Sequence, residues 1–312
     1  MKPQQADRPE KQRGTRTRGG WLGVYLRGFA MGVAELVPGV SGGTIAFISG
    51  IFDELVGTLA GLRLPSVGLL RRRGPLGWIA PYWQQHNLTF LLCLGIGMLS
   101  SVALLAHLLS LLIETVRPLV WGFFFGLILY SVYEIGRHLA QRALLRFAPI
   151  GLLLGLLIAF LEPLPAEPAL WMFFFGGALA VSAWLLPAVS GSFLLLVLGL
   201  YESVLAAVTT LNWSVLLVFG VGCASGLLLF ANLLSWLLGR YRESIVALLT
   251  GFMAGAAVQL WPWQVAGEPV SPRMYEAGQT GDALVTAVCI AMLAGALVIA
   301  AMSRLTRTDP AA

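Results

Sequence analysis

The stretch Pro38-Gly39-Val40-Ser41-Gly42-Gly43-Thr44 returns 149 residues later as Pro187-Ala188-Val189-Ser190-Gly191-Ser192-Phe193. Both copies interrupt an apolar segment with residues that break helices. Both are followed by an apolar run that ends in glycine, an aliphatic residue, an aromatic residue and an acid, at Gly50 to Asp53 and at Gly199 to Glu202. Interrupted apolar helices at corresponding places in two halves of a chain predict a transport site.

The composition of the 312 residues is that of an integral membrane protein. Hydrophobic residues make up 58% and charged residues only 11%, about half the charged fraction of an average soluble domain, which excludes a water-soluble globule. We predict an all-α polytopic membrane protein. The apolar runs that approach the roughly 20 residues needed to span a bilayer lie at 88–113, 117–135, 148–161, 213–238, 244–260 and 283–303. The run 148–161 is short, so its span is expected to extend into its flanks.

The net charge of +5 is concentrated in the ends and a few loops. Residues 1–20 are basic and rich in Gln, Pro and Gly, which predicts a disordered tail; the competing interpretation is the start of a cleaved signal peptide. Basic segments beside membrane helices report orientation, so we infer no nucleic-acid partner from them. The thiols Cys93, Cys223 and Cys289 lie in apolar segments and are expected to behave as small hydrophobes, without a disulfide or a metal.

A second alignment strengthens the repeat. At an offset of 125 residues, nine positions are identical in the two halves, which composition bias hardly explains. They are Gly95, Gly97, Ser100, Leu104, Ala106, Leu108, Leu109, Ser110 and Leu112, matched by Gly220, Gly222, Ser225, Leu229, Ala231, Leu233, Leu234, Ser235 and Leu237. The offset changes from 149 because the loop 63–87 of the first half is almost absent from the second. Both halves therefore share one plan.

Positive charges predict how the halves are oriented. Basic residues gather in the N-terminal tail and at 63–73, 137–146, 240–242 and 304–307, which places these parts and both termini in the cytoplasm. The segments 21–62 and 169–211 then each begin and end on one side of the membrane, on opposite sides for the two halves. Each half would comprise a re-entrant helix pair and three transmembrane helices, and the second half would be inverted relative to the first.

The predicted organisation is thus one membrane domain made of two inverted-topology repeats. A cytoplasmic tail covers 1–20 and a short one 306–312. The first repeat is 21–165, with a re-entrant pair at 21–62, an interfacial loop at 63–87 and spans within 88–161, and the second is 166–305, with a re-entrant pair at 169–211 and spans within 213–303.

Two alternatives stay open at this point. Trp21 to Val37 and Ile45 to Leu62 could be separate thin spans, at about 25 Å each by helical rise, because loop charges do not separate thin spans from deep hairpins. The loop 63–87, which mixes aromatic and basic residues, suits an amphipathic segment at the membrane surface, or it is an ordinary solvated loop.

The repeated motif suits anion binding. Proline ends one helix and begins the next, glycine lets backbone N–H groups approach a ligand, and Ser41 and Ser190 add hydroxyl groups at the same place. Each helix N-terminus carries the equivalent of about half a positive charge, so two that face each other suit a phosphate. The alternative use of such small residues is close helix packing, which we favour for Gly95, Gly97, Gly220 and Gly222.

A family resemblance rests on these same residues. The segment from Gly28 to Leu55, GFAMGVAELVPGVSGGTIAFISGIFDEL, resembles the signature of the polyprenyl-phosphate transporter family, and the segment from Leu185 to Leu205, LLPAVSGSFLLLVLGLYESVL, resembles its second signature. The similarity covers about 21–305. Glu35 stands where the family commonly has Asp, which keeps the acid, and Ala188 replaces a usual Gly, which tightens the backbone approach there.

The resemblance implies a cargo and a site. The cargo would be undecaprenyl phosphate, returned across the bacterial plasma membrane for cell-envelope synthesis, with no enzymatic step and no cofactor or metal. Only the phosphate head needs a protein path, because the isoprenoid tail is already at home in hydrocarbon. The implied phosphate-binding positions are Pro38, Gly39, Ser41, Gly42, Gly43, Thr44, Pro187, Ser190, Gly191 and Ser192.

Inward movement of this anion requires compensation. A membrane that is negative inside opposes it by about 2.3 kcal/mol per charge per 100 mV, so a proton or cation gradient is expected to drive it. Acids inside membranes are candidates for that role, here Glu35, Asp53 and Glu202, although they could merely lie at the interface. Arg27 and Arg117, at segment edges, either guide the headgroup or extend to lipid phosphates.

Two other classes of function are alternatives to transport of this lipid. A membrane enzyme that processes lipid phosphates would need a nucleophile, an acid–base pair or a metal cluster, and the chain has no His-Glu-x-x-His motif and no Cys/His cluster. An anion channel or small-solute transporter would use the same broken helices, and a lateral opening for a lipid tail would distinguish it from a lipid transporter. The sequence predicts no oligomeric state.

Overall fold

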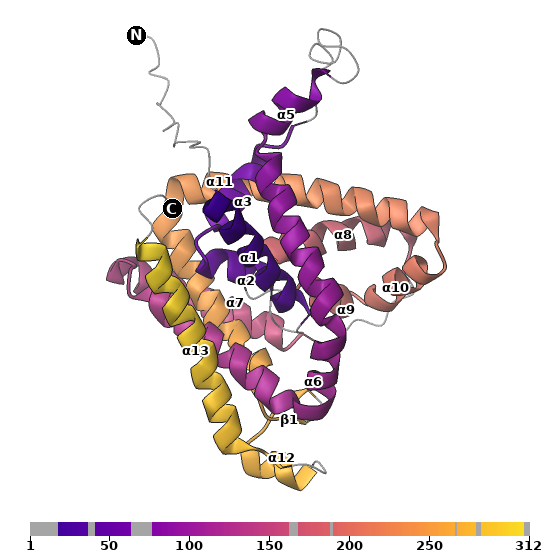
Figure 1. Cartoon of the computed structure of the whole chain (residues 1–312). Coiled ribbons are helices and arrows are strands. Elements are labelled where there is room, and N and C mark those ends of the chain that lie inside the picture. The colour runs from indigo at the N-terminus through magenta and orange to yellow at the C-terminus, as the bar shows by residue number, and fades with distance from the viewer. Residues whose placement is uncertain are drawn as a thin grey trace.

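The computed structural model describes residues 18–36, 41–63, 77–161, 168–187, 190–265, 267–278 and 282–308. Almost all of this part of the chain is helical (Figure 1). Within the described residues, four helices are long and apolar enough to cross a membrane, or up to six if each of two bent helix pairs counts as one span. The prediction of an all-α polytopic membrane protein is confirmed at this level.

The helices follow the two halves of the sequence. The first half holds α1 (Arg18–Glu35), α2 (Gly42–Ile48), α3 (Phe52–Ala60), α5 (Ile79–Gln85), α6 (Leu88–Gly136) and α7 (Gln141–Ala159). The second holds α8 (Leu170–Leu185), α9 (Gly191–Val197), α10 (Tyr201–Thr209), α11 (Trp213–Ala256), the 3-10 turn η1 (Ala257–Leu260), α12 (Pro272–Gly278) and α13 (Val285–Thr308). The strands β1 (Gln264–Val265) and β2 (Glu268–Pro269) form a small antiparallel hairpin between η1 and α12.

Several boundaries differ from the sequence predictions. The helix α1 begins at Arg18, inside the predicted tail 1–20, and residues 1–17 lie outside the described residues. The helix α7 begins at Gln141, which gives the short run 148–161 the length of a span. The helix α13 continues to Thr308 and so includes the start of the predicted tail 306–312.

The apolar run after each motif is sharply bent. The helices α2 and α3 meet at 116°, and α9 and α10 meet at 110°. Gly50 and Gly199 stand at these corners with φ of 78° and 68°, values that glycine adopts without strain. Residues 45–62 therefore do not form one straight helix, since each limb rises only about 10 to 14 Å at 1.5 Å per residue. The bent pair is a broken span or a re-entrant segment, and the re-entrant arrangement stays a prediction.

The long helices repeat the plan as well. Each of α6 and α11 contains one residue with non-helical backbone angles, Val116 (φ −138°, ψ 44°) and Tyr241 (φ −133°, ψ 38°). These two residues are 125 apart, which is the offset that aligns the two halves in this region. In α6 the break coincides with Pro118, which removes a backbone donor. Each long helix is thus two apolar segments joined at a kink.

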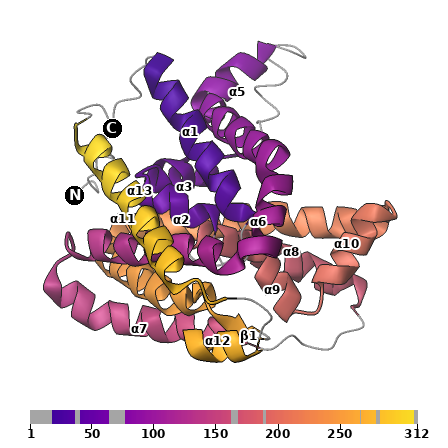
Figure 2. The same ribbon diagram turned by 60° about the horizontal axis from the view of Figure 1, so that its bottom comes forward.

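The helices pack within and between the halves. Within each half the first helix packs on the long one, α1 on α6 and α8 on α11. The last span of each half instead packs on the long helix of the other half: α7 packs on α11, and α13 packs on α6. Figures 1 and 2 show α13 lying along the side of α6 in both views. The core lies where the two halves meet.

Glycines set the closest helix contacts at repeated positions. A Cβ on Gly97 would lie 2.3 Å from the carbonyl oxygen of Tyr25, and a Cβ on Gly222 would lie 2.1 Å from that of Phe174. Gly222 is the repeat counterpart of Gly97, and Phe174 is the repeat counterpart of Tyr25. The packing role predicted for Gly97 and Gly222 is confirmed. For Gly95 and Gly220 it is wrong, since a Cβ there would meet nothing within 4 Å.

This contrast supplies a matched stability test. We expect Gly97→Leu to lower the stability of the fold by about 3 kcal/mol, because overpacking pushes α1 away from α6. Gly95→Leu, two residues earlier on the same helix, has open space and should change stability by less than about 0.5 kcal/mol. Thermal unfolding in detergent compares the two variants. Equal midpoints would contradict the packing seen between α1 and α6.

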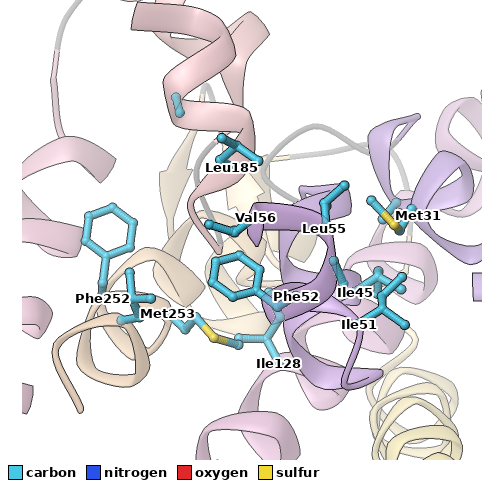
Figure 3. Close-up of a cluster of buried hydrophobic side chains, with 14 of the residues drawn as sticks. Met31, Ile45, Ile51, Phe52, Leu55, Val56, Ile128, Leu185, Phe252 and Met253 are labelled. Atoms are coloured by element: carbon cyan, nitrogen blue, oxygen red, sulfur yellow. The ribbon is translucent and has the colours of Figure 1, made fainter. Parts of the chain in front are cut away.

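The buried core surrounds α3. Figure 3 shows Phe52 and Val56 of α3 beside Ile128 of α6 and Met253 of α11. Ile128 and Met253 are both fully buried and occupy corresponding positions of the two long helices. The corner of the first half is therefore inserted between the long helices of both halves.

The loop 63–87 contains the short helix α5, which projects from the bundle (Figure 1). None of its residues is buried. Tyr82 packs its ring edge-on against Trp78 and donates a hydrogen bond of 2.8 Å to the carbonyl of Arg63. The residues 64–76 lie outside the described residues, and an interfacial position for this loop stays a prediction.

Candidate functional site

The two repeated motifs come together in the structure. The hydroxyl of Ser41 donates a hydrogen bond of 3.3 Å to the carbonyl of Trp184, at the end of α8. Gly43 lies so close to the same region that a Cβ there would be 2.5 Å from the Trp184 oxygen and 3.2 Å from the Leu186 oxygen. Because both neighbours are backbone atoms, only glycine fits. The first helix break therefore rests directly on the second.

The N-terminus of α2 already holds an anion, the carboxylate of Glu35. Ser41 has extended backbone angles and caps the helix by accepting a hydrogen bond of 3.1 Å from the N–H of Gly43. The N–H of Gly42 donates a hydrogen bond of 2.5 Å to Oε1 of Glu35. A carboxylate is favoured at a helix N-terminus for the same electrostatic reason as a phosphate. Glu35 thus accepts a hydrogen bond from the Gly42 N–H, which is one of the groups that the sequence analysis predicts to bind the phosphate.

Trp184 connects the two halves at this point. Its indole lies near the carboxylate of Glu35, and its carbonyl accepts a hydrogen bond from the hydroxyl of Ser41. Trp184 is also the repeat counterpart of Glu35, 149 residues further along. Sequence reasoning missed this residue, although the repeat alignment that matched the prolines places it opposite the acid.

The second motif is built differently at the same positions. Ser190 caps α9 by accepting a hydrogen bond of 3.4 Å from the N–H of Phe193, and the hydroxyls of Ser190 and Ser192 are 2.8 Å apart. Gly191 packs against the backbone of Ala180, where a Cβ would lie 2.5 Å from the carbonyl oxygen. Pro187 is buried beside the break. This N-terminus therefore presents paired hydroxyls where the first one holds a carboxylate.

The ten residues that the family resemblance implies for phosphate binding differ in their exposure, and two of them lie outside the described residues. Ser41, Gly42, Gly43 and Thr44 are buried at the start of α2, while Ser192 is exposed. Pro38 and Gly39 lie outside the described residues. The phosphate-binding role of all ten stays a prediction.

The two arginines named from the sequence have different surroundings. Nε of Arg27 donates a hydrogen bond of 3.2 Å to the carbonyl of Ser49, at the C-terminal end of α2, a place where cations stabilise helices. Arg117 is exposed directly after the kink at Val116, and its guanidinium carbon lies 4.7 Å from the ring centre of Trp121. Headgroup guidance by either residue stays a prediction.

The other two candidate acids lie away from the breaks. Asp53, in the first turn of α3, forms an ion pair of 2.6 Å with Arg242 of α11. Glu202, its counterpart in the first turn of α10, is exposed. Sequence reasoning missed Arg242, although the repeat aligns it with Arg117. Neither acid shares the site of Glu35.

An apolar cavity of about 230 Å³ lies behind α2. It is bounded by α1, α2, α6 and α13 and is lined by Phe29, Ala30, Val33, Ile45, Ile48, Phe123, Phe124, Leu127, Val298 and Ile299. Ile45 is one helical turn from Ser41, and Val33 is two residues from Glu35, so the cavity begins next to the helix break. Val298 is partly exposed on α13, so the cavity reaches the side of the molecule.

The two corresponding helix crossings differ in sequence beside the cavity. Where α7 crosses α11, Gly155 and Gly255 let the backbones approach closely. At the corresponding positions of α13 and α6 the chain has Ile299 and Tyr130 instead. Ile299 itself lines the cavity, while one turn earlier Gly126 and Gly295 bring the backbones of α6 and α13 into close contact.

In the described part of the chain, no three His, Cys, Asp or Glu side chains lie together as a group that could hold a metal ion. What the site offers is a pair of capped helix N-termini, one carboxylate bound at the first of them and an adjoining apolar space. Such a site can bind an amphiphile with an anionic head.

Comparisons with known proteins point to carriers of such anionic lipids. A family model described as undecaprenyl phosphate translocase-like matches residues 31–278. A protein of Vibrio cholerae serotype O1 named polyprenyl-phosphate transporter is 41% identical over 263 residues, which are 83% of this chain and 82% of that protein. A protein of Staphylococcus aureus with the same name is 30% identical over 262 residues, 78% of this chain and 86% of that protein. No solved structure matches the chain.

Proposed function

Because the chain belongs to the undecaprenyl phosphate translocase-like family, we propose that it carries undecaprenyl phosphate or a similar polyprenyl phosphate across the bacterial plasma membrane. The protein acts as a transporter and not as an enzyme, so the lipid leaves unchanged. The observation that carries this proposal is the contact between the two helix breaks, Ser41 on Trp184, next to an apolar cavity. A phosphate head and an isoprenoid tail each have a matching surface there.

The proposal includes the orientation of the protein. Basic loops place both termini in the cytoplasm, and the halves are inverted-topology repeats, each with a re-entrant helix segment and three spans. The repeated bends at Gly50 and Gly199 and the repeated kinks at Val116 and Tyr241 support a common plan. Inversion then brings one break to the midplane from each side of the membrane. The recycling direction is inward, toward the site of precursor synthesis.

Phosphate binding is proposed to compete with Glu35. In the described conformation the Glu35 carboxylate accepts from the Gly42 N–H, so a phosphate must displace it. A protonated Glu35 is a weaker acceptor and carries no charge that repels the phosphate. Proton uptake by Glu35 would therefore accompany phosphate binding, and the pair would cross the membrane potential with less net charge. This gives a physical route for coupling to a proton gradient.

The apolar cavity favours a lipid cargo over a soluble anion. Its lining is apolar, and it runs from the break toward the surface of α13. A channel for small hydrated anions would need polar walls there, because an anion in such a cavity would lose its hydration without compensation. We assign the cavity to the first isoprene units of the tail.

The test is translocation by the purified protein in proteoliposomes. Labelled undecaprenyl phosphate is placed in one leaflet, and its arrival in the other is measured with and without a proton or sodium gradient. We expect movement at least tenfold faster than in protein-free vesicles. Release of inorganic phosphate would instead indicate an enzyme, and uptake of sulfate or chloride without lipid movement would indicate an anion transporter.

The tail assignment makes a separate prediction. Ala30→Phe fills the cavity and is expected to slow transport of the long-chain lipid about tenfold, because the first isoprene units lose their place beside α2. Transport of a polyprenyl phosphate too short to occupy the cavity should change less than threefold. Ala103→Phe, at an exposed position of α6, serves as the control. Equal slowing of long and short lipids by Ala30→Phe would contradict the assignment.

A further inference from the structure

One ion pair joins the two halves of the molecule on one face. Oδ2 of Asp53 lies 2.6 Å from a terminal guanidinium nitrogen of Arg242. Asp53 is in the first turn of α3, just after the corner at Gly50. Arg242 follows the kink residue Tyr241 of α11. The pair therefore ties the bent corner of the first half to the kink of the second half's long helix.

The repeat supplies a second set of the same groups. Glu202, 149 residues after Asp53, is in the first turn of α10, just after the corner at Gly199. Arg117, 125 residues before Arg242, follows the kink residue Val116 of α6. Both residues keep the charge of their counterparts. The second half thus has an acid at its corner and the first half has a base at its kink.

The second set is not joined in the described conformation. Arg117 stacks on Trp121, 4.7 Å from the ring centre. Glu202 is exposed and forms no ion pair with any residue that the structure describes. The two corners are therefore in different states although their sequences correspond.

The apolar faces of the corners differ in the same way. On α3, Val56 is 1% exposed and Leu59 is 6% exposed; their counterparts on α10, Leu205 and Val208, are 52% and 53% exposed. The helix α3 packs on α11, whereas α10 has no packing of that extent on α6 among the described elements. Figure 1 shows α3 within the bundle and α10 at its edge.

We propose that Arg117 and Glu202 form the matching ion pair in a second conformation, in which α10 packs on α6 and the pair between Asp53 and Arg242 is broken. This inference rests on the proposed function, because alternating access in inverted-repeat transporters is largely a rocking of one repeat against the other around a fixed site. In the proposed motion the two corners exchange their docked and exposed states. The occupant of the exposed face of α10 is then α6 of the same chain. With the proposed orientation, the Asp53–Arg242 pair closes the cytoplasmic side and the Arg117–Glu202 pair closes the outer side.

Partly exposed ion pairs suit this purpose. The side chains of Asp53 and Arg242 are 51% and 61% exposed, and such pairs are weak enough to break in every transport cycle. Each pair shifts the balance between two states instead of fixing one of them. A deeply buried pair would hold a single state.

Charge reversal tests the proposed pair. Arg117→Glu and Glu202→Arg are each expected to slow translocation about tenfold, and the double variant should recover to within about threefold of the native rate. Arg240→Glu, which changes an exposed arginine two residues before Arg242, should change the rate less than twofold. A double variant no faster than the singles would overturn the proposal. That outcome would leave Arg117 with a role of its own, such as headgroup guidance.

Cross-linking separates the ion pair from the transport function. With Cys93, Cys223 and Cys289 replaced by serine, the pair Arg117→Cys and Glu202→Cys should cross-link within one chain. Adding Asp53→Asn should raise the yield at least twofold, because it releases the opposite side. No cross-link with or without Asp53→Asn, or a cross-link only between two copies, would overturn the proposal. If the native protein fails to move the lipid while the cross-link still responds to Asp53→Asn, the proposed function fails and the alternating pair stands.

Discussion

Replacing Gly43 with valine is expected to reduce translocation of undecaprenyl phosphate at least a hundredfold. A Cβ at this position would lie 2.5 Å from the carbonyl oxygen of Trp184 and 3.2 Å from that of Leu186. Both atoms belong to the backbone of the second break, so valine must push the two motifs apart. A displacement of about 1 Å in a site that depends on positioning costs about a hundredfold in rate, and the hydrogen bond from Ser41 to Trp184 would be lost as well. Proteoliposome translocation measures the effect.

A matched glycine controls for general damage. Gly57 is on α3, and a Cβ there would meet nothing within 4 Å. Gly57→Val should keep at least half of the native rate and a similar thermal midpoint. A Gly43→Val protein that is folded and transports at the native rate would show that contact between the two breaks is not needed.

Replacing Glu35 with glutamine is expected to abolish the response of transport to a proton gradient. Glutamine keeps an oxygen that can accept from the Gly42 N–H, so the capped turn is retained, but it neither binds nor releases a proton. We expect an imposed gradient to accelerate the native protein about tenfold and the Glu35→Gln variant by less than twofold. Paired assays with and without a gradient give the comparison.

The conservative change provides the control. Aspartate keeps the titratable group, and the resemblance noted above has aspartate at this position. Glu35→Asp should therefore retain coupling, even if its shorter side chain lowers the rate. If the Glu35→Gln variant stays fully coupled to the proton gradient, Glu35 is not the proton carrier. Asp53 and Glu202 are then the remaining candidates.

Much of the fold follows from the sequence by local rules. The matched prolines and glycines fix where the helices stop. The offset of 149 residues predicts the boundaries of α9 and α10 from those of α2 and α3, and the offset of 125 predicts the start of α11 from that of α6. The corners at Gly50 and Gly199 were less clear. A single glycine is tolerated within a helix, so the run 45–62 looked continuous until the backbone showed a left-handed residue there.

The partners of the site residues could not be predicted in this way. Glu35 meets Trp184 and Asp53 meets Arg242, and both contacts join residues from different halves of the chain. Their geometry depends on how α2 and α3 enter between the long helices, which no local pattern specifies. The repeat alignment could have suggested both partners, because each is the counterpart of a residue already under consideration.

By itself, the sequence determined a helical membrane protein with two related halves and a broken helix in each, because apolar length, helix breakers and repeat spacing act over short distances along the chain. Only the tertiary structure decided that the two breaks touch, that a carboxylate holds the first, and that one corner is docked while its counterpart is exposed. Two segments with the same pattern of residue types can differ in this way because docking depends on the surfaces that the rest of the molecule offers. The two corners share the order glycine, aliphatic, aromatic, acid, whereas the packing available to them differs.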